Sequence, residues 1–584
     1  MNTENIKIYT SEVLVIGCGG AGLRAAIEAK NNGANVIVLG KRVKKDAHTS
    51  LAAGGINAAF GNVDKKDSWL QHFADTYLEG YEIGDPQAIE IMSKEALEIV
   101  EEIDKWGANL AKLKNGKFDQ RFFGAHTFRR TCYAGDFTGK SILDALITKA
   151  NELEIPVFDS KYVTQLLVED NRCFGAFSID IQNKKKSVFL ADSIILATGG
   201  YTRIWKRSSS REKENTGDGI YLGLKAGCKL IDMEMVQFHP TGMLSPVELE
   251  GSLVTEAVRG EGGKLLNKNN ERFMKNYDSK RMELSTRDRV AVAIYNEIIE
   301  GRGTKSGGVF LDISYKEKEF IVRQIPEIYK KFLEYQNLDI SEYPMEVAPT
   351  AHYSMGGIKV NPKDHSTGVN GLYACGEVAG GLHGANRLGG NSLAEILIFG
   401  RRAGMAASEF SKINKFHGNP SPSIKKASIN IDKLIKKGSE NIFELENDLY
   451  NVMWKYCGVI KNEGNLKIGL KEIHRLNTKI MNVDISSLGK LSDGLINLLN
   501  LKASILCAKT TIISALERKE SRGAHQRSDF NETNYKNDFN YIIYLENNKE
   551  IVLKKHYYQK IDKNLKKIVD STRKITNFDR RLLE

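Results

Sequence analysis

The sequence predicts an α/β protein in which a strand-and-helix domain is interrupted by an inserted domain and followed by a helical domain and a C-terminal extension. Three observations lead to this prediction. A strand, a glycine-rich turn, a helix and a second strand follow one another within the first 40 residues. Further apolar strands run into glycine turns far downstream, and the glycine density drops after about residue 415. Strands that alternate with helices are typical of a parallel sheet.

The first unit has the pattern of a βαβ fold. EVLVIG (12–17) and NVIVLG (35–40) are short apolar strands, and AGLRAAIEAKNNG (21–33) has helical spacing and ends at a glycine. The turn carries the GxGxxG pattern, whose glycines permit a tight turn, close approach of a pyrophosphate and close helix packing. We therefore predict a Rossmann-like dinucleotide site with phosphate at the helix N-terminus. Its residues are Gly17, Gly19, Gly20 and Gly22.

The downstream glycine turns indicate which dinucleotide binds. The second strand ends in Gly40-Lys41, where an NAD site carries an acid for a ribose hydroxyl, so NAD is disfavoured. DSIILATGGY (192–201), GLYACGEVAGG (371–381) and GANRLGGNSLAEILIFGRRAG (384–404) each join an apolar segment to glycines. Several such turns on one sheet suit an extended dinucleotide such as FAD. Independent strands with flexible loops are the alternative.

The predicted domain boundaries follow from the change in pattern along the chain. The polar stretch 233–349 interrupts the strand-and-glycine elements, as an inserted capping domain would. The FAD-binding domain therefore comprises residues 1–232 and 350–415. Residues 416–530 show helical periodicity and form the predicted helical domain, and residues 531–584 are the C-terminal region.

Composition narrows the class of protein. The seven cysteines among 584 residues are scattered singly, so we expect neither a disulfide framework nor a metal or iron-sulfur site. The polar N-terminus fits neither a signal peptide nor a membrane span, and a reducing cytoplasmic setting is expected. The net charge of +11 fits a solvated surface or a polyanionic partner such as a nucleic acid or an acidic membrane.

Three polar stretches and two further arginines carry groups that can hold a small anion. The stretches are VQFHPTGM (236–243), LVTEAVRGEGG (253–263) and APTAHYSMGG (348–357). Arginine pairs bidentately with carboxylates, so guanidiniums beside imidazoles suit a dicarboxylate. Each residue alone has an ordinary alternative, such as a buried histidine or a surface ion pair. The candidates are His239, Thr255, Glu256, Arg259, Arg287, His352 and Arg387.

Eight motifs occur in order across residues 12–530: IGCGGAGLRAAIEA, HTSLAAGGINAA, TGDGIYLGLKAG, QFHPTGM, TEAVRGEGG, PTAHYSMGG, LYACGEVAGGLHGANRLGGNSLAE and ESRGAHQRSDF. Together they resemble the flavoprotein subunit of succinate dehydrogenase and fumarate reductase. The resemblance implies a catalytic subunit that interconverts succinate and fumarate by hydride transfer to or from N5 of FAD.

The resemblance also implies a role for each matching position. Arg287 falls at the proton shuttle, with Glu256 and Arg259 feeding it, and His48 falls at the histidine that bonds covalently to FAD. The positions implied to hold the C4-dicarboxylate substrate are His239, Thr255, His352, Arg387 and Phe123. The positions implied to contact the cofactor are Gly17, Gly19, Gly20, Gly22, Lys41, His48, Thr49, Gly54, Gly55, Asp218, Glu377, Ser392 and Leu393.

Three alternatives stay open at this point. Asp46-Ala47 stands where the family has arginine-serine before the covalent histidine, so noncovalent FAD is the alternative at His48. L-aspartate oxidase, which converts aspartate to iminoaspartate, is the alternative enzyme. It carries a glutamate at the position of Phe123, and this difference argues against it. The third is a basic FAD-bearing RNA-binding protein, for which the sequence offers no basic motif or aromatic platform.

The electrons of the flavin need a destination outside this chain, because its scattered cysteines cannot hold iron-sulfur centres. The resemblance therefore implies a separate iron-sulfur subunit. We expect no nucleic-acid partner and contact with a membrane only through partner subunits. The expected location is cytoplasmic, peripheral on the cytoplasmic face of a membrane.

Overall fold

The computed structural model describes residues 6–486, 493–547 and 550–575. Its largest sheet has seven strands in the order β5-β2-β1-β8-β7-β6, with β15 also paired to β8. β6 and β7 form an antiparallel edge, and the other pairings among β1, β2, β5, β8 and β15 are parallel. The strands are β1 Lys7–Ile16, β2 Val36–Leu39, β5 Val157–Phe158, β6 Lys161–Glu169, β7 Arg172–Asp180, β8 Lys186–Leu196 and β15 Leu372–Ala374. The predicted α/β class is confirmed.

The N-terminal unit forms because two short apolar strand segments flank a segment whose apolar residues recur at helical spacing. In β1, Val13 and Val15 face one core while Leu14 and Ile16 face another, so both faces of the strand are covered. Helix α1 (Gly20–Asn31) follows, and β2 pairs in parallel with β1. The predicted βαβ unit is confirmed. The strand begins earlier than predicted because its first residues continue to pair with β8.

Parallel pairing places the carboxyl ends of four strands at one edge of the sheet. Gly17 follows β1, Gly40 follows β2, Ala197 follows β8 and Cys375 follows β15. Chain segments that leave neighbouring strand ends in such a sheet enclose a crevice where ligands bind. The N-cap of α1 is Gly19, which offers no capping side chain, and the helix N-terminus faces this edge.

Helix α11 (Asn391–Ile413) packs along α1 on one face of the sheet. Glycines allow this close approach, since a Cβ at Gly404 would lie 2.2 Å from the carbonyl oxygen of Ala25. The long helix therefore holds the turn at its own N-terminus beside the glycine turn of α1. Other helices of this domain are α2 Trp69–Glu79, α3 Pro86–Ile103, α4 Thr138–Glu152 and α5 Asp218–Ala226, and a short strand pair joins β3 Ile56–Asn57 to β4 Thr131–Cys132.

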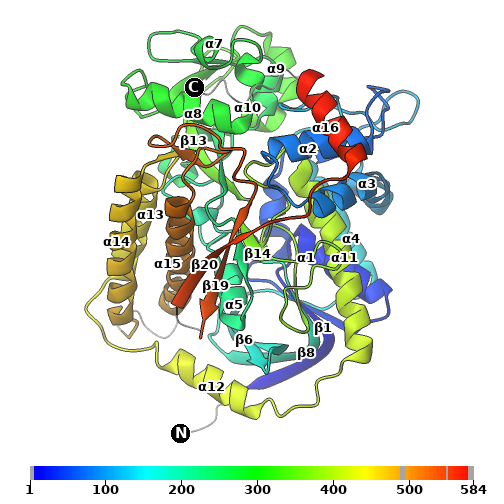
Figure 1. Cartoon of the computed structure of the whole chain (residues 1–584), viewed down its shortest axis with the longest axis vertical. Helices are drawn as coiled ribbons and strands as arrows, with labels where there is room; N and C mark the ends of the chain where they lie inside the picture. The colour runs from blue at the N-terminus through cyan, green and yellow to red at the C-terminus, as the bar shows by residue number, and fades with distance from the viewer. Residues whose placement is uncertain (1–5, 487–492, 548–549, 576–584) are drawn as a thin grey trace.

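The region between β9 (Leu230–Ile231) and β14 (Gly357–Lys359) holds a second sheet with a core of its own, in the upper part of Figure 1. Its strand order is β10-β13-β12-β11, and α8 packs against β10. Strand β13 spans residue 349, where the inserted domain was predicted to end. The predicted domain boundaries stay predictions. The elements are β10 Val236–Met243, β11 Lys264–Leu266, β12 Val309–Asp312, β13 Met345–Ser354, α6 Ala257–Gly260, α7 Met274–Tyr277, α8 Arg287–Ile299, α9 Lys318–Gln324 and α10 Pro326–Gln336.

Helices dominate the chain after α11, as predicted. Among them, α15 is long and apolar enough to cross a membrane by length and composition. However, 72% of its most apolar window is buried, and it packs against α14 and α13, as the core helix of a bundle does. The elements are α12 Ser421–Asp432, α13 Ile442–Tyr456, α14 Glu463–Lys479 and α15 Gly494–Glu517, with the short strands β17 Ile460–Lys461 and β18 Gln526–Arg527.

The C-terminal region returns to the first domain. The hairpin of β19 and β20 joins a five-stranded sheet in the order β16-β14-β9-β19-β20, and α16 packs on α2 (Figure 1). The sequence did not predict this hairpin. The elements are β9 Leu230–Ile231, β14 Gly357–Lys359, β16 Ala379–Gly380, β19 Asn540–Glu546, β20 Glu550–His556 and α16 Lys563–Ile575.

Two of the glycines in the first turn, Gly19 and Gly22, differ in what an added methyl group would meet. A Cβ at Gly22 would lie 1.8 Å from the carbonyl oxygen of Gly17, whereas one at Gly19 would make ordinary contacts of 3.6 Å or more. We expect Gly22→Ala to lower the midpoint of thermal unfolding by several degrees, roughly the effect of an overpacked core position. Gly19→Ala is the matched control and should leave the midpoint nearly unchanged. Equal midpoints for the two variants, measured without cofactor, would contradict this packing.

Candidate active site

A large cavity opens at the carboxyl edge of the seven-stranded sheet and extends to the inserted region. Its empty volume is about 1800 Å³. Of the site residues predicted from the sequence, all except Gly22 and Arg259 line it. These lining residues are Gly17, Gly19, Gly20, Lys41, His48, Thr49, Gly54, Gly55, Phe123, Asp218, His239, Thr255, Glu256, Arg287, His352, Glu377, Arg387, Ser392 and Leu393.

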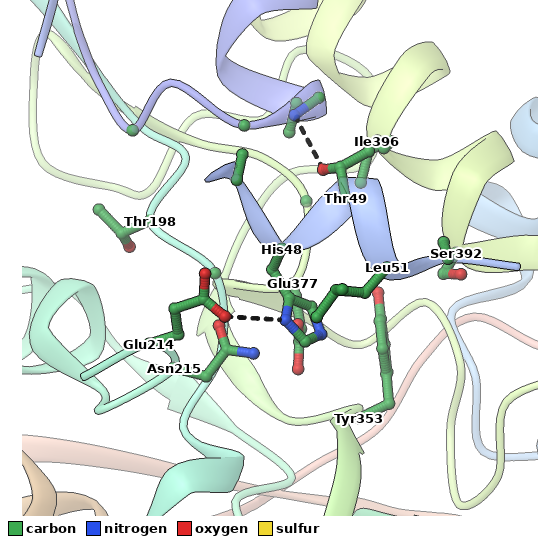
Figure 2. Close-up of a pocket in the computed structure, with 18 of the residues that line it drawn as sticks. His48, Thr49, Leu51, Thr198, Glu214, Asn215, Tyr353, Glu377, Ser392 and Ile396 are labelled. Carbon is green, nitrogen blue, oxygen red and sulfur yellow. Dashed lines mark hydrogen bonds and ion pairs between the residues drawn. The ribbon is translucent and has the colours of Figure 1, made fainter. Parts of the chain in front are cut away.

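The part of the cavity beside the glycine turns has the features of a dinucleotide site. The amide of Gly20 donates to Thr49 Oγ1 at 3.0 Å, which fixes the segment after β2 against the helix N-terminus (Figure 2). Thr198 Oγ1 is buried and has no hydrogen-bond partner within the described part of the chain. A buried hydroxyl without a partner beside a helix N-terminus suits a polar ligand. These residues fit the pyrophosphate region of FAD.

Lys41 occupies the position at which an NAD site would carry an acidic residue. A carboxylate from another part of the chain, that of Asp218, lies next to it. The Nζ of Lys41 donates to Asn500 Oδ1 at 2.8 Å and lies 3.3 Å from the carboxylate of Asp218. Asp218 is the first residue of α5, so this carboxylate comes from a separate element. The lysine thus ties α5 and α15 to the end of β2.

His48 lies on a short 3₁₀-helix, His48–Leu51, with its ring against a carboxylate that the sequence motifs do not include. Its Nδ1 is 3.2 Å from Glu214 Oε2, and Figure 2 shows this contact. Burial alone would lower the pKa of His48, but the hydrogen bond and charge of Glu214 outweigh it and raise the pKa. Burial would raise the pKa of Glu214, and the contact with His48 lowers it instead. The two groups therefore form a hydrogen-bonded pair at the wall of the cavity, with Nδ1 of His48 facing the carboxylate.

The other end of the cavity contains a buried pair of arginine and glutamate. Arg287, the first residue of α8, donates from Nε to Glu256 Oε2 at 2.8 Å. The amide of Gly124 donates to the second carboxylate oxygen at 3.1 Å. Burial raises the pKa of Glu256, but the charges of Arg287 and Arg259 prevail and lower it to about 2. Glu256 is therefore a carboxylate at neutral pH.

Arg259 lies behind this pair rather than in the cavity. Its Nη2 is 3.9 Å from Glu256 Oε2, and its Nη1 donates to the carbonyl oxygen of Glu283 at 2.5 Å. The side chain is fully buried, and burial lowers its pKa. Arg259 can thus reach the cavity only through Glu256.

A second guanidinium, that of Arg387, projects from the turn before α11. Its Nη2 donates to Gln237 Oε1 at 3.1 Å and its Nη1 to Ser392 Oγ at 3.2 Å. Its guanidinium carbon lies 4.3 Å from the ring centre of Tyr353. Burial, with the nearby charge of Arg287, lowers the pKa of Arg387 to about 10, so it stays a cation at neutral pH.

Two imidazoles from neighbouring strands complete this end. The rings of His239 on β10 and His352 on β13 have centres 5.3 Å apart. Burial lowers both pKa values, assisted by the charge of Arg287 for His239 and of Arg387 for His352. The amide of Thr241 donates to Nδ1 of His239 at 3.2 Å. Neutral His239 therefore carries its proton on Nε2, where it can donate to an anion.

Phe123 contributes an apolar part of the cavity wall. The ring packs so closely on main chain that a Cβ at Gly54 would lie 3.0 Å from it and one at Gly389 3.2 Å. Thr255 also faces the cavity, and its Oγ1 accepts from the amide of Ala257 at 3.3 Å. The site thus offers two guanidiniums and a neutral imidazole donor to an anion beside the cofactor cradle.

Sequence reasoning missed three residues of this site: Gln237, Tyr353 and Glu214. Gln237 Oε1 accepts from both Arg287, at 3.3 Å, and Arg387, at 3.1 Å, so it fixes their separation. Gln237 and Tyr353 lie within two of the polar stretches. The prediction selected mainly histidine, arginine and acidic side chains there, so it did not include this amide and this phenol. Glu214 stands in an unremarkable charged loop, and no local signal marks it.

Known proteins and family models resemble this chain over most of its length. Residues 12–393 match the family model described as FAD binding domain, and residues 446–574 match fumarate reductase flavoprotein C-term. One subunit of the fumarate reductase (CoM/CoB) of Methanothermobacter marburgensis is 42% identical over 528 residues, covering 90% of this chain and 96% of that protein. The succinate dehydrogenase flavoprotein subunit of Rickettsia conorii is 35% identical over 559 residues, covering 91% and 92%.

The chain belongs to the succinate dehydrogenase and fumarate reductase flavoprotein family. Solved structures of the family have the same fold. E. coli quinol fumarate reductase matches with a TM-score of 0.90 at 30% identity, covering 95% of this chain and 98% of that chain. Mycobacterium smegmatis Sdh1 matches with a TM-score of 0.85 at 37% identity, covering 95% of each. The resemblance seen in the motifs is confirmed, and with it the oxidoreductase class and an FAD-binding domain.

The position of Gln237 between two guanidiniums gives a test of anion binding. Gln237→Glu places a carboxylate where Arg287 and Arg387 meet, so the cations pair internally and attract a ligand anion less. We expect the Kd for a small dicarboxylate such as malonate, measured by its effect on flavin absorbance, to rise roughly tenfold or more. Gln182→Glu, an exposed change of the same charge, is the control and should not alter it. An unchanged Kd in Gln237→Glu would mean that the anion binds elsewhere.

Proposed function

We propose that this protein is the flavoprotein catalytic subunit of an enzyme that interconverts succinate and fumarate. The observation that supports this most directly is the convergence of Arg287, Arg387, His239 and His352 on one cavity that also contains the FAD-type glycine turns. FAD, when bound, supplies a hydride acceptor or donor at N5 of its ring. The chain's own residues then have to hold the four-carbon diacid and move one proton.

The cations and donors at the far end of the cavity are suited to hold two carboxylates. Arg387 offers a planar guanidinium braced by Gln237 and Ser392, and neutral His239 offers an Nε2 proton. Together with Thr255 and His352, these groups would fix both ends of the substrate and stabilise charge that develops on a carboxylate during the reaction. Fixing both ends orients the central carbon atoms, which lowers the entropic cost of reaction.

Arg287 is the proposed proton shuttle. An arginine has too high a pKa to act alone as a base, so it must receive a proton as it gives one away. Glu256, 2.8 Å from Arg287 Nε, can exchange that proton, and Arg259 stands 3.9 Å behind it. The order Arg287, Glu256, Arg259 therefore leads from the cavity into the inserted region. Fumarate reduction uses this path in one direction and succinate oxidation in the other.

We further propose that FAD is covalently attached at His48 and that electrons pass to a separate iron-sulfur subunit. The relatives named above are subunits of fumarate reductase or succinate dehydrogenase. The part of the chain that the structure describes contains no group of three or more metal-ligating side chains. It includes all seven cysteines, each of which is buried and free. The subunit would lie at the cytoplasmic face of a membrane and reach it only through partners.

Substrate tests separate this proposal from L-aspartate oxidase. The FAD-loaded protein should lose flavin absorbance with succinate and regain it, after chemical reduction, with fumarate. Iminoaspartate formed from L-aspartate would favour the oxidase instead. Phe123 supports the dicarboxylate enzyme, because a phenyl ring packed on Gly54 offers no carboxylate to pair with an ammonium group. Absence of any response to succinate and fumarate would refute the proposal.

Glu256→Gln tests the proton path. The amide keeps the shape of the side chain but cannot accept a proton from Arg287. We expect kcat for fumarate reduction to fall by roughly a hundredfold or more, with FAD content unchanged. The control Glu248→Gln alters an exposed residue of the same inserted region and should leave kcat unchanged. A rise in KM with no change in kcat would show that Glu256 only holds the binding site.

A further inference from the structure

A buried carboxylate, Glu214, contacts the proposed attachment histidine and takes no part in the reaction described above. Glu214 lies in the loop between β8 and α5, far in sequence from the 3₁₀-helix that carries His48. Only 6% of its side chain is exposed, whereas His48 is 29% exposed. A carboxylate so deeply buried carries an energetic cost unless it is paired, and its nearest imidazole partner is His48.

Several contacts hold Glu214 in this place. The amide of Arg211 donates to its Oε2 at 3.2 Å, and the guanidiniums of Arg42 and Arg211 lie 3.5 Å from its Oε1. Arg211 also donates to the carbonyl oxygen of Asp46 at 2.6 Å and to Ser50 Oγ at 3.3 Å. These contacts therefore hold the loop that carries Glu214 against the segment that carries His48.

The contact determines which nitrogen of His48 is free. Nδ1 faces Glu214, and Figure 2 shows the other ring nitrogen on the side away from that carboxylate. An imidazole whose Nδ1–H donates to a carboxylate presents the lone pair of Nε2, as in the aspartate-histidine pair of serine proteases. The other acid drawn nearby, Glu377, is engaged elsewhere, since the amide and hydroxyl of Ser354 donate to its Oε1 at 3.0 and 2.9 Å.

From this arrangement we propose that Glu214 is the positioning residue for covalent attachment of FAD to Nε2 of His48. This inference rests on the proposed function, which supplies both the cofactor and the oxidant. Glu214 holds the ring with Nε2 available and stabilises the positive charge that the ring gains as Nε2 bonds to carbon. In this role it acts through His48 and does not touch the substrate.

The attachment step balances with fumarate as oxidant. One bond forms between Nε2 and the carbon of a ring methyl group of the flavin, and one C–H bond of that methyl group breaks. Two electrons remain on the flavin, which is thereby reduced, and fumarate reoxidises it. One proton leaves the methyl group and one leaves Nδ1 by way of Glu214. The two protons and two electrons convert fumarate into succinate.

The test compares acid-stable flavin in the full chain and in four variants, each produced with FAD and incubated with fumarate. The variants are His48→Ala, Glu214→Gln, Glu214→Asp and Glu212→Gln. Glu212 is an exposed neighbour in the same loop and serves as the matched control. Total FAD is measured by absorbance before denaturation. Attached FAD is measured as colour that stays with the acid-precipitated chain and as the mass gain of the peptide that contains His48.

We expect attachment in the unaltered chain and in Glu212→Gln, and none in His48→Ala. Glu214→Gln should bind FAD but attach it roughly tenfold more slowly or worse, the order of one lost charge-assisted hydrogen bond. Glu214→Asp keeps the charge on a shorter side chain and should recover part of the rate. If Glu214→Gln binds no FAD, the decision rests on Glu214→Asp, where attachment at the full rate overturns the proposal.

Two further outcomes separate this inference from the proposed function. Full attachment in Glu214→Gln would overturn the role of Glu214 while leaving the function untouched. Release of all colour from the unaltered chain, together with normal fumarate reduction, would also overturn the role and show that FAD is bound noncovalently. Bound FAD that responds to neither fumarate nor succinate would instead overturn the proposed function.

Discussion

The arrangement of the site depends on an excess of buried positive charge. Two guanidiniums, those of Arg287 and Arg259, lie 2.8 and 3.9 Å from one carboxylate, that of Glu256. A third, that of Arg387, shares Gln237 Oε1 with Arg287. Arg387 has no ion-pair partner in the described part of the chain and depends on Gln237, Ser392 and the ring of Tyr353. Burying an unpaired charge is costly, so the fold must hold it in place. An anionic ligand that enters the cavity would compensate this cost, as the proposed diacid would.

The fold maintains this charge by bringing separate elements to one place. Glu256 and Arg287 come from the inserted region, and Arg387 comes from the turn that α11 holds against α1. Gln237 on β10 joins them, because its carbonyl accepts from both arginines while its amide donates to the carbonyl oxygen of Arg387 at 3.0 Å. A shift of the inserted region would break these bonds. The arrangement of the two guanidiniums therefore depends on the position of the inserted region.

The sequence predicted the elements whose cause is local and missed those that depend on distant contacts. The βαβ unit follows from apolar period and glycine spacing, and the charged site residues stand in short motifs. The hairpin of β19 and β20 was missed because its partner, β9, lies some 300 residues earlier in the chain. Glu214 was missed for the same reason, since its significance comes only from the distant His48. Gln237 was missed because its bridging role requires knowing where both arginines lie.

The departure at Asp46-Ala47 takes on a different meaning in three dimensions. The sequence alone presents it as the loss of an arginine beside His48. In the folded chain, Arg211 brings a guanidinium to the same segment, donating to the carbonyl oxygen of Asp46 and to Ser50. The same loop supplies Glu214 to the imidazole. A charge missing at one position of the sequence is thus supplied from a loop 165 residues away. The electrostatic environment of His48 comes from groups that are near it in space, such as Glu214 and Arg211. The effect of a change in the motif therefore depends on those groups as well as on the motif itself.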